Sequence, residues 1–195
     1  SPLPEHLLLQ VVSVITDPLT TTDELIPSGE TSSLRSNPLK LAEYTLSRKD
    51  PGYVGRAKTV NAMETARLAN PGDADLLARA RGLFAACGLD TLQGAADLKQ
   101  VGLGSTIFAV KPGDGSAREQ AASCQKVLGG WANMAVEYAT KRYRSNLINW
   151  GMLPFIVDAS LADTLKVGDW LVVPNVRSAV QNADPSFTGY VASEG

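Results

Sequence analysis

The apolar positions of the chain fall into short runs separated by longer stretches in which apolar and polar residues alternate at helical spacing. Three runs contain many β-branched or aromatic side chains and predict buried strands, at 7–15 (LLLQVVSVI), 105–110 (STIFAV) and 152–157 (MLPFIV). A fourth strand is expected within 163–174 (DTLKVGDWLVVP), which contains a Lys-Val-Gly-Asp turn.

The clearest helical pattern covers residues 70–89 (NPGDADLLARARGLFAACGL), where Asp73 can cap the start and Gly88 follows the end. Further helices are expected at 39–48, at 91–102, from the loop at 113–120 to about Leu128, and at 131–147, with a break at Leu128–Gly130. Strands that alternate with helices predict an α/β fold, and the 195 residues are expected to form a single domain.

Composition excludes several classes of function. Apolar residues make up 44% of the chain and charged residues 19%, and the net charge is −2, so no basic surface for nucleic acid or anionic lipid is expected. No run of about 18 apolar residues predicts a membrane span. Cys87 and Cys124 are far apart, and His6 is the only histidine, so we expect no metal site formed by this chain alone. This cysteine usage favours a reducing, cytoplasmic compartment.

The stretch GDGSAREQ (113–120) follows a predicted strand and opens a predicted helix. One explanation is structural, because Ser116 and Glu119 have the spacing of a capping box. The other is an anion site, because glycines expose backbone N–H groups at the positive end of a helix and Arg118 adds a two-pronged donor. The same field would stabilise a serine alkoxide, so that Ser116 could act as a base. The two explanations are compatible, and the local pattern leaves both open.

Two other segments also have both a structural and a functional explanation. The polar stretch at 16–39 is long for a connecting loop, and in it Asp23 and Arg35 stand twelve residues apart. A surface ion pair would explain them, and so would a binding loop. In YRSNLINWGMLPF (143–155), Gly151 and Pro154 indicate a helix end followed by a strand, and Arg144 and Asn146 are expected to be solvated or to cap the helix.

In this order, the three segments resemble the C-terminal swivelling domain of the aconitase superfamily. That family has Gly-x-Gly-Ser-Ser-Arg-Glu-His at a helix start, then Leu-Gly-Gly, then Asn-Leu with Gly-Leu/Met-Leu-Pro three residues later. Upstream it has Thr-Thr-Asp, Pro-x-Gly, and an arginine twelve residues beyond the aspartate. The corresponding segments here are Gly113–Gln120, Leu128–Gly130, Asn146–Pro154 and Thr21–Arg35. The resemblance covers about residues 14–174.

This resemblance implies a swivelling β/β/α domain with a small closed β-barrel flanked by helices. It also implies a lyase that dehydrates and rehydrates hydroxy di- or tricarboxylic acids with a [4Fe-4S] cluster, which is bound outside this chain segment. By the same resemblance, Ser116 would be the catalytic base, Arg35 and Arg118 would bind substrate carboxylates, and Asp23 would support the site by hydrogen bonding. Gly115 and Ala117 would complete the substrate-binding loop.

The sequence departs from the family pattern at two positions, because Ala117 replaces the second serine and Gln120 replaces the histidine. Both changes indicate a divergent hydratase rather than a standard aconitase. The chain is expected to be a piece of a longer enzyme whose cluster-bearing N-terminal domains are its partners, and to be inactive alone. Two alternatives are a separate small subunit that pairs with a cluster-bearing large subunit, as in isopropylmalate dehydratases, and a non-catalytic carboxylate-binding module.

Overall fold

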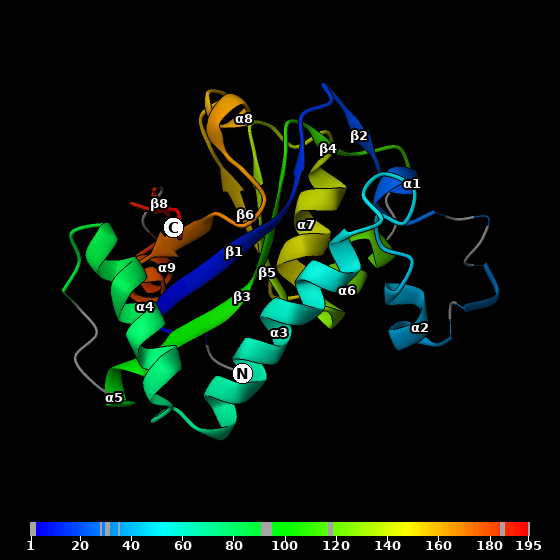
Figure 1. Ribbon diagram of the computed structural model, residues 1–195. Helices are drawn as coiled ribbons and strands as arrows, with labels where there is room; N and C mark the ends of the chain where they lie inside the picture. Colours follow the sequence, from blue (N-terminus) through cyan, green and yellow to red (C-terminus); the bar gives the residue numbers. More distant parts are fainter. Residues whose placement is uncertain are drawn as a thin grey trace. The chain divides into compact units, whose positions relative to one another are not determined.

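The computed structural model describes residues 3–27, 29, 32–34, 36–90, 95–116, 119–183 and 186–194 (Figure 1). The chain divides into two compact units. Unit 1 comprises Ser1–Val11, Val60–Gly104 and Gly168–Gly195, and unit 2 comprises Val12–Thr59 and Ser105–Val167. Both units contain strands and helices, which confirms the predicted α/β class.

Unit 1 is built on antiparallel strands. The first half of β1 (His6–Ile15) pairs with β7 (Trp170–Val173), and β7 pairs with β8 (Tyr190–Ala192). The first residues of β3 (Val101–Ala109) also belong to this unit, as do α4 (Ala74–Ala86), α5 (Ala95–Leu98) and α9 (Val176–Gln181). Its core contains Leu8, Ala80, Leu83, Phe84, Leu98, Val101, Leu103, Trp170, Val172 and Ala192.

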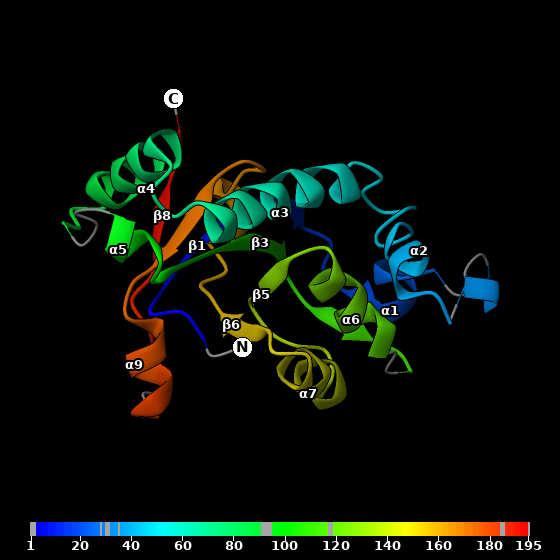
Figure 2. The ribbon, with the colours of Figure 1, turned by 90° about the horizontal axis from the view of Figure 1, so that it is seen from below.

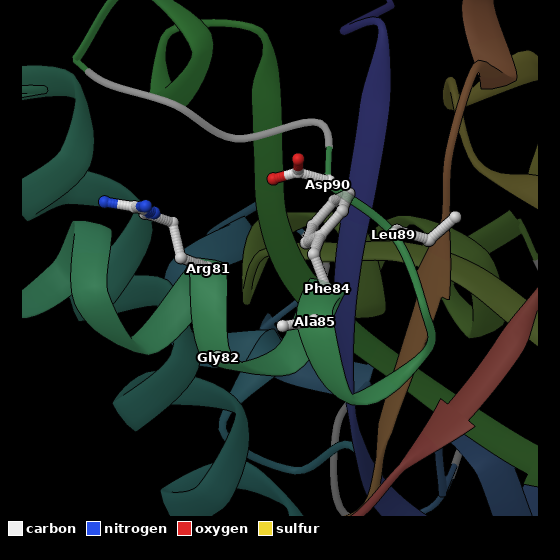
Figure 3. A pocket seen from close by; sticks show the side chains of 6 residues that line it. All are labelled: Arg81, Gly82, Phe84, Ala85, Leu89 and Asp90. Carbon is white, nitrogen blue, oxygen red and sulfur yellow. The ribbon is translucent and has the colours of Figure 1, made fainter.

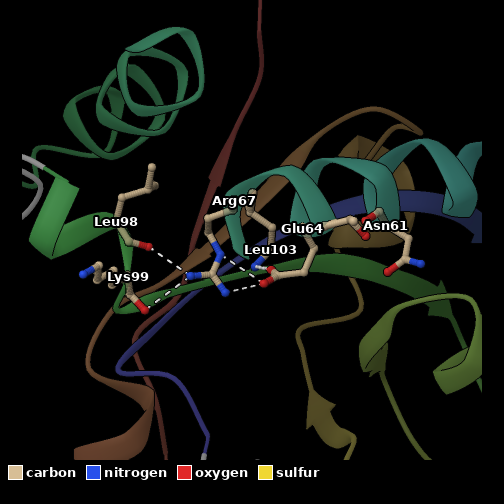
Figure 4. Close-up of polar contacts among 7 residues, drawn as sticks. Asn61, Glu64, Arg67, Leu98, Lys99 and Leu103 are labelled. Carbon is tan, nitrogen blue, oxygen red and sulfur yellow. Dashed lines mark hydrogen bonds and ion pairs between the residues drawn. The ribbon is translucent and has the colours of Figure 1, made fainter. Parts of the chain in front are cut away.

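A buried ion pair lies inside unit 1 (Figure 4). Arg67 and Glu64, one turn apart on α3 (Tyr53–Ala69), form a salt bridge with side-chain exposures of only 8% and 12%. The Arg67 guanidinium also donates to the carbonyl oxygens of Leu98 and Lys99, at 3.2 and 3.3 Å, and Glu64 accepts the backbone N–H of Leu103. The pair therefore ties this part of α3 to α5 and to the start of β3.

Unit 2 is built on parallel strands. The second half of β3 pairs with β5 (Gly130–Ala135), which pairs with β6 (Leu153–Ile156). The helices are α1 (Thr22–Leu25), α2 (Pro38–Ala42), α6 (Glu119–Val127), α7 (Lys141–Asn149) and α8 (Leu161–Thr164), together with the 3₁₀ turn Ser32–Leu34 and the part of α3 up to Thr59. Helix α6 contacts α2 and α7, and Figure 2 shows α6 beside α7. A second, two-stranded sheet joins β2 (Thr20–Thr21) to β4 (Pro112–Asp114).

The strand order is β3-β1-β7-β8 within unit 1 and β6-β5-β3-β1 within unit 2. Neither order returns to its first strand, so the closed β-barrel that the resemblance implies is not shown. Among the described helices, none is both long enough and apolar enough to cross a membrane.

Several elements match the predicted pattern. Asp73 caps α4 by accepting the N–H of Leu76 at 2.9 Å, and Gly88 follows the helix with φ +75°. The strands predicted at 7–15 and 152–157 are β1 and β6, and the helix expected at 39–48 is the shorter α2.

Three predictions of secondary structure need correction. Residues 131–135, predicted as part of a helix, belong to the buried strand β5, because two parallel neighbours override the helical propensity of Trp-Ala-Asn-Met-Ala. Within the helix expected at 91–102, residues 91–94 lie outside the described residues and Ala95–Leu98 form α5. The prediction is wrong at its end, because Val101 and Gly102 belong to β3. The longest helix, α3, was not predicted, and neither were α9 and β8.

Candidate functional site

The structure brings together two motifs that lie far apart in the sequence, both in unit 2. Strands β2 and β4 pair in parallel, with Thr20 opposite Pro112 and Thr21 opposite Asp114. Just beyond this ladder, the buried Thr22 hydroxyl donates to the carbonyl oxygen of Ser116 at 3.0 Å. The segment that carries Asp23 therefore lies directly against the glycine-containing loop.

The loop backbone is fixed on α7. Gly113 has φ +97°, and an added Cβ would lie 2.4 Å from Cβ of Tyr143, so only glycine fits. The Thr140 hydroxyl, which caps α7, donates to the carbonyl oxygen of Gly113 at 3.0 Å. At Gly115, φ is +103° but the nearest atom to an added Cβ is 3.5 Å away, so the backbone conformation alone favours glycine.

A closed ring of three hydrogen-bonded, buried polar side chains connects α6 with α7. Gln125 donates to the Tyr143 hydroxyl at 2.9 Å, Tyr143 donates to Asn133 at 2.5 Å, and Asn133 donates back to Gln125 at 2.6 Å. Burial raises the pKa of Tyr143, so its hydroxyl keeps the proton that it donates. These residues come from α6, β5 and α7, and the ring therefore fixes the direction of α6, which begins just after the loop.

Asp23 is positioned by the first turn of α1. Thr21 and Glu24 form a reciprocal capping box, with both backbone-to-side-chain bonds at 3.1 Å. The Asp23 carboxylate lies 3.9 Å from the guanidinium of Arg48, and both side chains are more than half exposed. Lys49 adds a second cation nearby, 3.3 Å from Glu24. Sequence reasoning missed Arg48, because only the tertiary structure brings it beside Asp23.

The predicted site residues are only partly described. Ser116 and Gly115 are exposed at the tip of the loop, and Asp23 is on the adjacent segment. Arg35, Ala117 and Arg118 lie outside the described residues. The convergence of the two arginines beside Ser116 therefore stays a prediction, and so does the capping box, which spans residues 117 and 118.

Beside the loop, a hollow of about 380 Å³ opens between the start of α6 and the first two turns of α7. Its lining residues are Glu119, Lys141, Arg142, Ser145 and Asn146.

A different hollow, of about 230 Å³, lies in unit 1 between α4 and the segment that follows it (Figure 3). It is lined by Arg81, Gly82, Phe84, Ala85, Leu89 and Asp90, none of which is a predicted site residue.

Comparison with known proteins bears on the fold. One solved structure with a similar fold is the crystal structure of 3-isopropylmalate dehydratase (leuD) from Methanocaldococcus jannaschii, with a TM-score of 0.52. The two chains share a fold. Their sequences are 19% identical, and the match covers 97% of this chain and 84% of that chain. No family model matches the sequence, and no curated protein matches it either.

The described residues do not fit an iron–sulfur cluster. Burial raises the pKa of Cys124 to about 11, so its thiol stays protonated at neutral pH, whereas a cluster is held by thiolates. Burial also raises the pKa of Cys87, which lies in unit 1. No group of three His, Cys, Asp or Glu side chains suited to a metal ion occurs in the part of the chain that the structure describes.

Proposed function

We propose that this chain is the substrate-binding and base-supplying part of a hydro-lyase that acts on hydroxy di- or tricarboxylic acids. The observation that carries the proposal is the contact between Thr22 and Ser116, because it joins the two motifs on which the resemblance to the aconitase superfamily depends. The shared fold with a 3-isopropylmalate dehydratase supports the same class of enzyme.

Ser116 is the proposed base that removes a proton from the carbon next to a substrate carboxylate. It is exposed, and it stands in a glycine turn just before the N-terminus of α6. The partial positive charge of that terminus, together with Arg118, stabilises an alkoxide at Ser116 and the negative charge that develops on the substrate. Arg35 and Arg118 bind carboxylates, and Asp23 orients the groups around them by hydrogen bonding.

The Asp23–Arg48 pair adds to this assignment. The exposed Arg48 guanidinium lies 3.9 Å from the Asp23 carboxylate and so adds a cation at the edge of the proposed site. Ala117, in contrast, offers no hydroxyl to the substrate, which distinguishes this site from that of a standard aconitase.

The chain requires a partner to complete the enzyme. Because its own cysteines do not fit a cluster, we propose that the [4Fe-4S] cluster belongs to cluster-bearing N-terminal domains or to a large subunit. The fold shared with a solved 3-isopropylmalate dehydratase chain supports the alternative of a separate small subunit that pairs with a large subunit.

The experiment uses the native protein with its partner and a panel of 2-hydroxy di- and tricarboxylic acids, with turnover followed by the ultraviolet absorbance of the unsaturated product. Ser116→Ala should lower kcat by about 10²–10⁴-fold, because the base is lost. Ser160→Ala, an exposed serine in a turn of unit 2, is the control and should leave turnover unchanged. Unchanged turnover in Ser116→Ala would refute the assignment, and carboxylate binding without turnover in the complete protein would identify a non-catalytic module.

A further inference from the structure

The backbone on both sides of Thr22 holds this residue in place. Residues 20 and 21 belong to the β2–β4 ladder, and Thr22 opens α1, whose start is capped by the reciprocal bonds of Thr21 and Glu24. Thr22 is only 4% exposed. Its side chain has few rotamers, because two heavy atoms branch from its Cβ. The Thr22 hydroxyl therefore has a fixed position, and it has one proton to donate.

Ser116, in contrast, has few contacts that hold it. It is exposed, and the donation from Thr22 at 3.0 Å is the one hydrogen bond that it forms with the residues that the structure describes. The preceding Gly115 adds little steric constraint, because the nearest atom to an added Cβ there is Thr22 Oγ1, at 3.5 Å. Among the described residues, the Thr22 hydroxyl is therefore the contact that orients the end of the loop.

This hydrogen bond also directs a carbonyl group of the loop. Because Thr22 is buried and Ser116 is exposed, the carbonyl oxygen of Ser116 points toward the protein interior and the rest of the residue faces solvent. The Thr140 hydroxyl holds the carbonyl oxygen of Gly113 in the same way, at 3.0 Å. A carbonyl oxygen carries partial negative charge and would oppose an anion if it turned toward one. The two threonine hydroxyls thus keep two loop carbonyls occupied, and this leaves the loop suited to negative charge.

We propose that Thr22 is the positioning residue of the base, and that its hydroxyl sets the orientation of Ser116 without contacting the substrate. This inference rests on the proposed function, in which Ser116 removes a proton from the substrate. The rate of such a step depends steeply on geometry, because a displacement of about 1 Å can cost about 10²-fold. Thr22 therefore acts on the proton-transfer step and not on the binding of the acid.

The test is steady-state kinetics of the native protein with its partner, on the hydroxy acid of the panel that gives the highest turnover. Thr22→Val keeps the branched shape of the side chain and removes the proton that it donates. It should lower kcat by about 10–100-fold and leave KM nearly unchanged. Thr22→Ser keeps the hydroxyl, so its kcat should be close to that of the unaltered enzyme.

Thr106→Val is the matched control. The Thr106 hydroxyl of β3 donates to the carbonyl oxygen of Ala132 at 3.0 Å, and Thr106 is 1% exposed, so the variant loses the same kind of buried bond away from the loop. It should lose stability to an extent similar to Thr22→Val and keep its kcat. Far-ultraviolet circular dichroism and the urea midpoint verify that each variant is folded.

Four results would overturn the positioning role: full kcat in Thr22→Val, a change in its KM alone, a low kcat in Thr22→Ser, or an equally large loss of kcat in Thr106→Val. The proposed function fails separately, when Ser116→Ala retains full turnover. If Ser116→Ala loses turnover while Thr22→Val does not, the assignment of the base stands and the role of Thr22 is wrong.

Discussion

Replacing Gly113 by alanine should destabilise the protein more than any other single-methyl change in the loop. The φ of +97° disfavours every residue with a Cβ, which costs about 1–2 kcal/mol. The new Cβ would also lie 2.4 Å from Cβ and 2.5 Å from Cγ of Tyr143. Tyr143 is fully buried and its hydroxyl is held by Gln125 and Asn133, so it cannot move away, and overpacking of this kind costs a further 1–3 kcal/mol or so. We therefore expect a total loss of about 2–5 kcal/mol.

Gly115→Ala provides the control, because Gly115 has nearly the same φ but only Thr22 Oγ1, at 3.5 Å, near an added Cβ. It should lose only the backbone contribution, about 1–2 kcal/mol. Urea unfolding followed by tryptophan fluorescence measures both free energies of unfolding. Equal losses in the two variants would show that Tyr143 does not confine Gly113, and the account of how the loop is held on α7 would be wrong.

Three other predictions concern buried ionisable groups. Arg67→Met should lower the free energy of unfolding by about 3–5 kcal/mol, because it leaves the Glu64 carboxylate buried without its partner. Adding Glu64→Gln to this variant should restore part of the lost stability. If the two substitutions instead lower the free energy of unfolding additively, this reasoning is wrong. The free energy of unfolding should fall by about 3 kcal/mol as the pH rises from about 8.5 to 11, because the unfolded chain loses the Cys124 proton at a lower pH than the native state does. Cys124→Ala should remove this part of the pH dependence. Burial lowers the pKa of His6, so the unfolded state binds a proton that the native state resists, and stability should fall as pH decreases below about 6.5. In His6→Asn, the amide oxygen can still accept a hydrogen bond from the backbone N–H of Asn175. This variant should lose less stability below about pH 6.5 than the unaltered protein does, as measured by chemical unfolding at a series of pH values.

Elements with strong local signals were predictable from the sequence. Helix α4 has a capping aspartate and a terminal glycine, and β1 has a dense run of leucine and valine, so neighbouring residues alone determine the assignment. Helix α3 lacks such signals, since its buried positions include the small Ala57 and the charged Arg67. Strand β5 has a sequence that suits a helix, and it becomes a strand because β3 and β6 flank it.

The site was predictable as a set of motifs and not as a geometry. The order of the motifs drew attention to Asp23 and Ser116, which the structure places on adjacent segments. The ring formed by Gln125, Asn133 and Tyr143 gave no sequence signal, because three polar residues become partners only when two helices and a strand pack together. Arg48 was missed for the same reason.

The short β2–β4 ladder has a consequence for the order in which unit 2 can assemble. Thr22 and its acceptor Ser116 are 94 residues apart in the sequence. The chain must therefore lose the conformational entropy of closing this long loop before their hydrogen bond can form. During synthesis, Thr20–Thr22 can form their contacts with the loop only after the ribosome has added residues 112–116. A prematurely terminated chain that ends before Ser116 therefore lacks the contact that joins the Thr22 segment to the loop.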